Sequence, residues 1–228
     1  MAELRSGNHH ASESPSGRIE AVIFDLGGVL SSTGRPSDVA RRFPHDPIEV
    51  VLEVVMGDYG HDTDHPWHRL ERGEISMVDY RESLAELVIK AGLTPVPESD
   101  TESRSEEPFR FEPCEPMIEL VHDLRSEGIK VGVLTNNIRE FRPLWWSMVD
   151  FPSMFDDVVD SHEVGLRKPN PAIYELALQR LNTKPRNTAF LDDAVSNVKA
   201  ANMVGLHGIW VERDPSAAIG AVRQLAGL

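Results

Sequence analysis

From residue 113 to the end of the chain, short apolar runs alternate with stretches in which apolar residues recur every three or four positions. The short runs predict buried strands, and the periodic stretches predict amphipathic helices. Strands are expected at 129–134, 155–159, 188–191 and 206–211, and helices at 115–127, at 138–149, from Asn170-Pro171 onward, at 194–204 and at 217–225. Strands that alternate with helices of this length form a parallel sheet with helices on both faces, so the predicted fold class is α/β and Rossmann-like.

A further apolar run at 19–24 precedes this alternation and ends in Asp25-Leu26-Gly27-Gly28. A short β-branched and aromatic run bounded by a glycine pair is typical of a buried strand that ends in a turn. This strand must belong to the same sheet, because alone it could bury nothing. Asp25 then lies at the carboxyl end of a parallel strand, where open α/β sheets bind ligands, and is a candidate nucleophile or metal ligand. A carboxylate that only caps the turn is the alternative, and this stretch alone does not separate the two.

The segment between these two parts of the sheet has a different pattern. Helical periodicity occurs at 47–56 and at 76–91, and the two stretches are separated by a polar segment dense in His and Asp. An acidic, proline-containing linker is expected at 94–108. The chain is thus predicted to have an α/β core at 18–33 and 112–228, an all-helical insertion at 34–111, and a polar, disordered tail at 1–17.

The composition narrows the class of protein further. Of the 228 residues, 40% are hydrophobic and 26% are charged, which is ordinary for a globular protein. The formal net charge of −14 argues against binding to nucleic acid or to anionic membrane surfaces. No apolar run approaches the roughly 20 residues that cross a bilayer, no signal peptide is seen, and Cys114 is the only cysteine. We therefore expect a cytoplasmic protein, and the sequence leaves its oligomeric state open.

Polar residues of particular kinds follow two more predicted strands and lie in a loop between them. Thr135 and Asn136 follow the strand at 129–134 and precede a predicted helix, which suits an anion. Asp192-Asp193 follow the strand at 188–191, and two adjacent acids repel each other unless a cation lies near them. Lys168 lies in the loop between these strands. Each feature is common in turns and helix caps, so none is diagnostic singly.

The order of these residues is more informative than each one alone. A strand followed by Asp25, a helical insertion, a strand followed by Thr135, then Lys168 and a strand followed by Asp192-Asp193 resembles the four-motif pattern of the haloacid dehalogenase (HAD) superfamily. The residues around these four positions are similar to the phosphatase branch that includes the N-terminal domain of soluble epoxide hydrolase (subfamily IA, with a C1 cap). They occupy residues 21–30, 133–137, 168–174 and 190–201, and residues 67–76 are similar to the insertion of that branch.

The resemblance implies a Mg²⁺-dependent phosphomonoester hydrolase with an aspartyl-phosphate intermediate. Asp25 would attack phosphorus, and water would then hydrolyse the intermediate. The Asp25 carboxylate, the Gly27 backbone carbonyl and an acid of the fourth motif would hold Mg²⁺. Asp193 is favoured as the direct ligand and Asp192 as a water-mediated or outer partner, although the sequence does not separate these two roles.

The same resemblance implies how a substrate would be held. The Thr135 hydroxyl and the Asn136 amide would bind phosphoryl oxygens, and Lys168 would balance charge on Asp25 and on the phosphate. Asn197 would fasten the loop of the fourth motif. The insertion would be a mobile cap that closes over a small phosphorylated metabolite.

One position departs from the family pattern. Phosphatases of the superfamily usually carry a second Asp two residues after the nucleophile, as general acid and base, and here Gly27 takes its place. Because general acid–base help is worth about 10²- to 10⁴-fold, slow hydrolysis is expected unless the substrate has a good leaving group, such as a sugar 1-phosphate. The other possibility is a proton shuttle from the insertion, where His61, Asp62, Asp64, His65 and His68 cluster.

Two alternatives to a phosphatase remain open. A 2-haloacid dehalogenase-type hydrolase would use the same Asp nucleophile without a metal ion. Asp192-Asp193 disfavour it, because such an enzyme has no cation to hold. A catalytically weak or silent HAD-like binding protein is the second alternative, suggested by Gly27 and by the acidic insertion.

Overall fold

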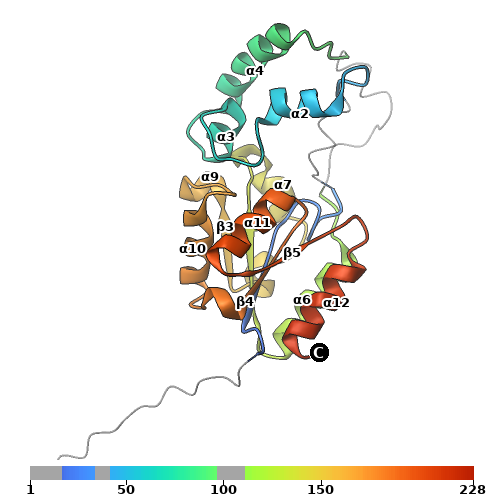
Figure 1. Ribbon diagram of the computed structural model, residues 1–228, viewed down its shortest axis with the longest axis vertical. Helices are drawn as coiled ribbons and strands as arrows, with labels where there is room; N and C mark the ends of the chain where they lie inside the picture. The colour runs from blue at the N-terminus through green and yellow to red at the C-terminus, as the bar shows by residue number, and fades with distance from the viewer. Residues whose placement is uncertain (1–16, 34–41, 97–110) are drawn as a thin grey trace, which may run out of the picture.

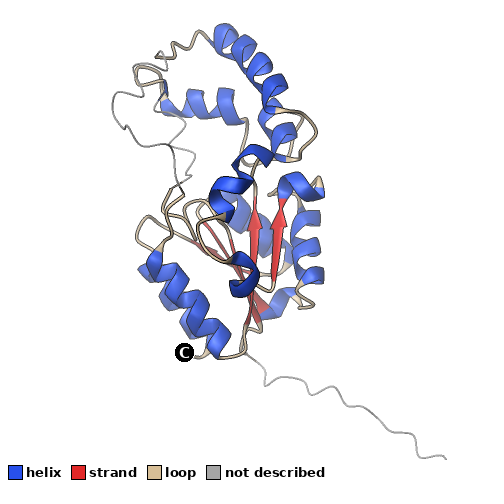
Figure 2. Cartoon of the chain, turned by 180° about the vertical axis from the view of Figure 1, so that it is seen from behind, coloured by secondary structure: helices blue, strands red, loops and turns tan. Residues whose placement is uncertain are grey.

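The computed structural model of the chain describes residues 17–33, 42–96 and 111–228. The tail predicted at 1–17 lies outside these residues except for Gly17, as does most of the linker predicted at 94–108. A group of helices lies above an α/β unit in Figure 1, and Figure 2 shows the same arrangement from behind. The described residues therefore form a sheet-containing core with a helical part at one end of it.

The core is built on one five-stranded sheet in which every pair of neighbouring strands is parallel. Its strands are β1 (Ala21–Phe24), β2 (Lys130–Thr135), β3 (Asp157–Asp160), β4 (Thr188–Asp192) and β5 (His207–Trp210), in the order β3-β2-β1-β4-β5. The predicted α/β fold is confirmed, with the first strand in the centre of the sheet. Phe24 of β1 is opposite Val133 of β2 and Leu191 of β4, so these three strands end on the same side of the sheet.

Helices cover both faces of this sheet, as expected for parallel strands with apolar residues on both sides. On one face lie α6 (Glu115–Ser126) and α12 (Ser216–Ala226), and on the other lie α10 (Pro171–Arg180) and α11 (Val195–Val204) (Figure 1). Each face has its own cluster of buried side chains, the first containing Phe24 and the second containing Ile23. Successive residues of a strand point to opposite faces, which is why these neighbours belong to different clusters.

The helix predicted at 138–149 is wrong in extent. The chain instead forms a 3₁₀ turn, η2 (Arg139–Phe141), followed by a short helix, α7 (Arg142–Trp146). Pro143 explains the break, because proline has no N–H to donate within a helix and is tolerated only in the first turn. Two further helices, α8 (Phe151–Met154) and α9 (Ser161–Val164), are not predicted, since they are too short for a helical period to be seen.

Between β1 and α6, residues 42–96 are the long described stretch, and they contain the helices α2 (Ile48–Met56), α3 (Pro66–Glu71) and α4 (Met77–Ala91). We call residues 42–96, which contain them, the helical insert. A capping box of Ser76 and Asp79 begins α4. No helix is predicted where α3 lies, in the polar stretch; it starts with Pro66, and the His65 ring accepts a hydrogen bond from the Trp67 N–H. No helix in the described part of the chain is long and apolar enough to cross a lipid bilayer.

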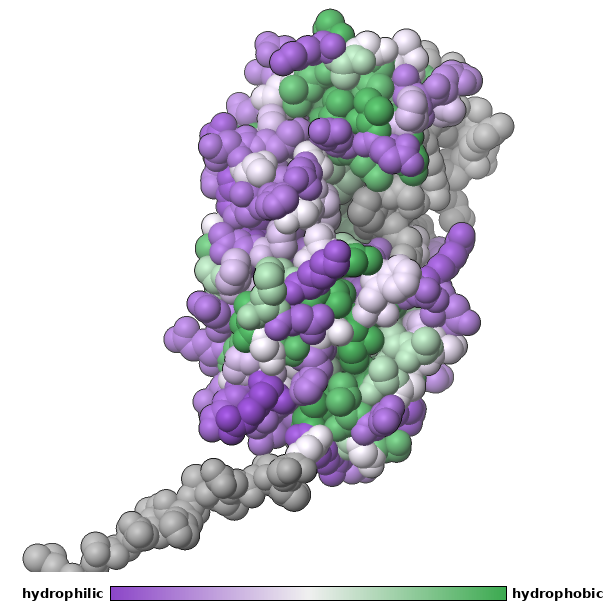
Figure 3. Space-filling view, in the orientation of Figure 1, coloured by the Kyte–Doolittle hydropathy of each residue, from purple (hydrophilic) through white to green (hydrophobic). Residues whose placement is uncertain are grey.

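The helical insert packs against the core partly through apolar side chains. Ile138, just after β2, is fully buried and belongs to one cluster with Leu70 of α3 and Tyr80 of α4. Hydrophilic side chains cover much of the face shown in Figure 3, with hydrophobic patches on both the helical insert and the core. The contact between the two parts therefore includes a small apolar cluster that is separate from the clusters on the two faces of the sheet.

Candidate active site

Asp25 lies directly after β1, at the carboxyl end of the central strand. Its N–H donates to the Leu191 carbonyl of β4 at 2.9 Å, so the chain leaves the sheet only after this residue. One carboxylate oxygen, Oδ1, accepts a hydrogen bond from the Leu26 N–H at 2.7 Å. The residue is only 8% exposed. The backbone thus fixes a buried carboxylate at the position where the sequence predicts a nucleophile or metal ligand.

Lys168 links Asp25 to Asp192. Its ammonium nitrogen lies 2.8 Å from Asp25 Oδ1 and 2.6 Å from Asp192 Oδ2, and the residue is 1% exposed. Although burial by itself would lower the pKa of Lys168, the carboxylates of Asp192 and Asp25 raise this pKa above its usual value. Lys168 is therefore held as a charged ammonium group between two carboxylates.

The Asn136 side chain holds the main chain of Lys168. Its Oδ1 accepts a hydrogen bond from the Lys168 N–H at 2.8 Å, and its Nδ2 donates to the Lys168 carbonyl at 2.9 Å. These two hydrogen bonds engage the amide oxygen and one of the two N–H groups of Nδ2, so the side chain ties β2 to the loop that carries Lys168. Thr135, the last residue of β2, is buried at the same end of the sheet, on the strand next to β1.

Asp192 and Asp193, at the end of β4, are held in different ways. Both Asp192 carboxylate oxygens accept hydrogen bonds from Asn197 Nδ2 at 3.1 Å, and Oδ1 also accepts one from the Ala194 N–H at 2.8 Å. The Lys168 ammonium group donates to Oδ2 as well, so both oxygens of the completely buried Asp192 carboxylate accept hydrogen bonds. Asp193 is fixed through its main chain, since its carbonyl accepts a hydrogen bond from the Trp210 indole N–H at 2.9 Å. Asn197 thus lies where it can fasten this loop.

Carboxylate oxygens of Asp25, Asp192 and Asp193 lie within 4.8 Å of one another. Burial raises the pKa of the Asp25 carboxyl well above its usual value; Lys168 opposes this rise, and the two other carboxylates add to it. When all three carboxylates are ionised, they and the one ammonium group leave two negative charges, which one divalent cation would balance. Oxygen ligands at this spacing suit Mg²⁺, a hard ion that prefers oxygen. The residues present therefore fit a magnesium site.

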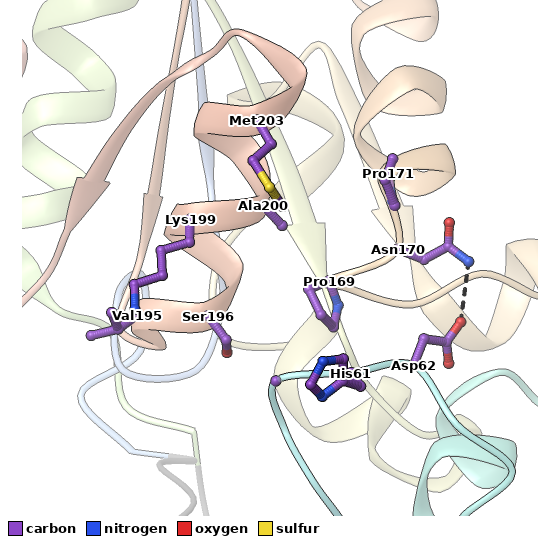
Figure 4. A pocket seen from close by; sticks show the side chains of 11 residues that line it. His61, Asp62, Pro169, Asn170, Pro171, Val195, Ser196, Lys199, Ala200 and Met203 are labelled. Atoms are coloured by element: carbon purple, nitrogen blue, oxygen red, sulfur yellow. Dashed lines mark hydrogen bonds between the residues drawn. The ribbon is translucent and has the colours of Figure 1, made fainter.

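The His and Asp side chains that the sequence suggests as a proton shuttle are engaged elsewhere. The His61 ring lies 2.6 Å from Asp58 on the exposed surface. Asp62 Oδ2 accepts a hydrogen bond of 3.2 Å from Asn170 Nδ2, across the junction with the core (Figure 4). The others are distributed over the helical insert: His65 caps α3, His68 is buried, and Asp64 is exposed. Among the described residues, the hydrogen bonds and ion pairs of these five groups do not reach Asp25.

His68 is buried in the helical insert and is expected to make its stability depend on pH. Its side chain is fully buried, and Nδ1 accepts hydrogen bonds from the Thr63 N–H at 3.1 Å and from the Thr63 hydroxyl at 2.9 Å. Burial, helped by the positive charge of Arg167, lowers the pKa of His68 to about 4. The folded chain therefore binds this proton less readily than the unfolded chain, in which the pKa of a histidine is about 6.5.

We expect the contribution of His68 to the free energy of unfolding to be fully present above about pH 6.5 and to be lost as the pH falls toward 4, by roughly 2 to 3 kcal/mol. Urea unfolding between pH 7 and pH 4 would measure this loss for the wild type and for His68→Asn. The asparagine Oδ1 can replace Nδ1 as acceptor but does not titrate, so the variant should lose less stability over this range. An equal loss in both chains would show that other groups cause the acid sensitivity.

Arg167 joins the core to the helical insert, and the sequence does not predict this role. Its Nε donates to Glu71 Oε2 at 2.7 Å, although the two residues are 96 positions apart. The only signal in the sequence is the place of Arg167 next to Lys168. A pocket of about 700 Å³ lies beside this junction, between the loop at 60–62, the loop at 169–171 and α11 (Figure 4).

Most of the chain matches a known protein family. A family model for haloacid dehalogenase-like hydrolases matches residues 19–205 of the chain. The chain belongs to this family. The resemblance inferred from the four ordered motifs is therefore confirmed, and the chain is a HAD-like hydrolase.

Two relatives are similar to this HAD-like hydrolase over most of its length. The chain is 35% identical over 219 residues to acyl-CoA dehydrogenase family member 10 of Mus musculus, covering 91% of this chain and 19% of that protein. It is 30% identical over 221 residues to the sesquiterpene phosphatase astK of Aspergillus oryzae, covering 91% of this chain and 97% of the other. The chain thus spans about a fifth of the first relative and nearly all of the second.

A solved structure of another HAD-family enzyme has the same fold. It comes from Bacteroides thetaiotaomicron, in complex with magnesium and inorganic phosphate, and is similar to this chain with a TM-score of 0.57 at 20% identity. The likeness covers 86% of this chain and 96% of that protein. At this level of identity, it shows that the two HAD-like proteins share their architecture.

Proposed function

We propose that the protein is a Mg²⁺-dependent phosphomonoester hydrolase that acts on a small phosphorylated metabolite through an aspartyl-phosphate intermediate. The main support for this proposal is that four charged side chains lie together at one end of the sheet: Asp25, Lys168, Asp192 and Asp193. Phosphoryl transfer to a carboxylate needs a nucleophile, a cation and oxygen ligands in one place. A phosphatase of matching length among the relatives supports it.

Asp25 is the proposed nucleophile. Lys168 and the Leu26 N–H both contact Oδ1, so we assign the attack on phosphorus to Oδ2. The new oxygen–phosphorus bond forms as the bond to the leaving-group oxygen breaks, and water then cleaves the acyl phosphate to release inorganic phosphate. Lys168 would balance the charge on Asp25 and on the phosphoryl oxygens in both steps.

The remaining site residues would hold the metal ion and the phosphoryl group. We assign the metal to the Asp25 carboxylate, the Gly27 carbonyl and Asp193. The two oxygens of Asp192 already accept hydrogen bonds, which supports Asp192 as the outer partner. When bound, Mg²⁺ supplies the positive charge that allows a phosphate dianion to approach these carboxylates. The Thr135 hydroxyl and the Asn136 amide would bind phosphoryl oxygens.

The substrate we favour has a good leaving group. Gly27 provides no acid to protonate the leaving-group oxygen, and the contacts of the His and Asp side chains in the helical insert do not support a shuttle from there. A sugar 1-phosphate or an acyl phosphate needs less protonation than a simple alkyl phosphate. A panel of phosphorylated metabolites assayed with Mg²⁺ would rank these classes, and sugar 1-phosphates should exceed primary alkyl phosphates in kcat/KM.

Metal dependence tests the proposed function. The purified protein should hydrolyse a chromogenic aryl phosphate in the presence of Mg²⁺, and EDTA should lower the rate at least about 10²-fold, because metal ions supply several kcal/mol of charge stabilisation. Added Mg²⁺ should restore the rate. A 2-haloacid dehalogenase would instead release halide from a 2-haloacid, undiminished by EDTA. If the wild type hydrolyses the aryl phosphate no faster than Asp25→Asn, the protein is a binding member of the family.

A further inference from the structure

A buried ion pair joins the helical insert to the loop that carries Lys168. Arg167 Nε and Glu71 Oε2, at the end of α3, are 2.7 Å apart. The two residues are 0% and 1% exposed, so neither charge retains contact with bulk water. A buried pair of this kind depends on both partners, because the removal of one leaves an uncompensated charge. The position of α3 over the core and the position of Arg167 are therefore linked.

Further contacts extend this pair on the side of the helical insert. The Tyr59 hydroxyl donates to Glu71 Oε1 at 3.1 Å, and the Arg167 guanidinium lies 5.4 Å from the centre of the Tyr59 ring. Arg167 Nη1 donates to the His61 carbonyl at 3.1 Å. Burial, with the charge of Glu71, raises the pKa of Tyr59 well above its usual value, so its hydroxyl stays a donor. Arg167 is thus enclosed by α3 and by the loop before it.

The same loop also touches the fourth motif. Ser196 Oγ, in the first turn of α11, donates to the Tyr59 carbonyl at 3.1 Å. Ser196 is three residues from Asp193, and Arg167 is bonded directly to Lys168. The loop at 59–62 therefore contacts both core loops that carry the charged site residues. On the other side, Lys168 is held by the side-chain amide of Asn136.

We propose that Arg167 is a positioning residue: its ion pair with Glu71 fixes the main chain before Lys168 and thereby holds the Lys168 ammonium between Asp25 and Asp192. The helical insert, through Glu71, then completes the catalytic arrangement as well as covering it. The expected effect on kcat rests on the proposed phosphatase function. The structural link between the ion pair and the loop that carries Lys168 does not rest on that function.

Two variants separate positioning from packing. Arg167→Met leaves Glu71 buried without its partner, whereas Glu71→Met combined with Arg167→Met replaces the pair by apolar side chains. Because the replacement of both partners of a buried pair is often neutral for stability, the double variant should regain much of the melting temperature that Arg167→Met loses. Recovery is incomplete because the Tyr59 hydroxyl loses its acceptor on Glu71. We expect kcat for an aryl phosphate to stay about 10- to 100-fold below wild type in both, since small displacements of a reacting group have effects of this size.

One control accompanies these variants. Arg69→Met breaks an exposed ion pair with Glu74, 3.3 Å apart and confined to the helical insert, and should leave kcat and the melting temperature unchanged. Wild-type kcat in the double variant would overturn the proposal, since the pair would then act only through packing. If Arg167→Met fails to fold, the double variant decides by the same criterion.

Hydrogen exchange tests the link without any turnover. The Lys168 N–H is bonded to Asn136, and it should exchange faster in the double variant than in the wild type or in Arg69→Met. Unchanged protection at 166–168 would overturn the proposal. A wild-type protein that does not hydrolyse phosphate esters would contradict the proposed function, and the exchange measurement alone would then decide whether Arg167 positions Lys168.

Discussion

Replacement of Asp25 by asparagine is expected to lower kcat for phosphate ester hydrolysis at least about 10⁴-fold, because the loss of a nucleophile removes the covalent route altogether. The substitution keeps the size of the side chain and its contact with the Leu26 N–H, which Oδ1 accepts at 2.7 Å. The fold should therefore persist, as circular dichroism and thermal unfolding would show. Steady-state assays with an aryl phosphate and Mg²⁺ measure the effect on kcat.

Asp123→Asn is the matched control for this variant. Asp123 belongs to α6, is part of a surface ion pair with Arg223 and lies away from the carboxyl end of the sheet. The same change of charge at this position should leave kcat unaltered. A residual rate in Asp25→Asn within tenfold of the wild type, with the fold retained, would mean that another group attacks phosphorus and that the nucleophile is misassigned.

The second large effect is expected at Gly27, where an aspartate should raise kcat for phosphates with poor leaving groups by about 10²- to 10⁴-fold. Those with good leaving groups should gain much less, because their departing oxygen needs little protonation. The backbone permits the change: Gly28 has a φ of 72°, in the region that favours glycine, whereas Gly27 does not have a positive φ. Rates for an alkyl phosphate and an aryl phosphate, each with Mg²⁺, give the comparison.

Gly27→Asn isolates the role of the carboxyl group in this experiment. Asparagine has nearly the same size as aspartate but cannot give or take a proton at neutral pH, so it should not raise the rate for the alkyl phosphate. Equal gains for both substrates in Gly27→Asp, or an equal gain in Gly27→Asn, would show that protonation is not what this site lacks. The proposal of a substrate with a good leaving group would then lose its main support.

Much of the fold was predictable because its signals are local. The apolar run before Asp25 predicts a strand from a few neighbouring residues, and the same holds for the strands before Thr135 and Asp192. Parallel strands end on the same side of a sheet, and the strands β2, β1 and β4 are neighbours in it, so these polar residues lie close together. The helix predicted at 138–149 was too long. Its apolar period continues across Pro143, but a proline cannot lie in the interior of a regular helix, so the helix begins only at Arg142.

The parts that were not predictable depend on partners distant in the chain. Nothing near Arg167 indicates that its charge is buried against Glu71, 96 residues away, because that pairing arises only when α3 packs on the core. The side-chain amide of Asn136 could equally have faced a substrate, and only the fold commits it to the main chain of Lys168. Hydrogen-bond partners are chosen by proximity after packing, which a linear pattern does not contain.

The sequence by itself therefore determined the class of fold and the order along the chain in which polar residues follow the strands. It also determined that Gly27 stands where the family usually has an acid. These follow from the identity of each residue and its nearest neighbours. The tertiary structure decided which side chains meet: Lys168 lies between Asp25 and Asp192, Asn197 donates to Asp192, and Arg167 of the core pairs with Glu71 of the helical insert. The physical reason is that burial removes water from these charged groups, so each must find a partner wherever the packed chain places one.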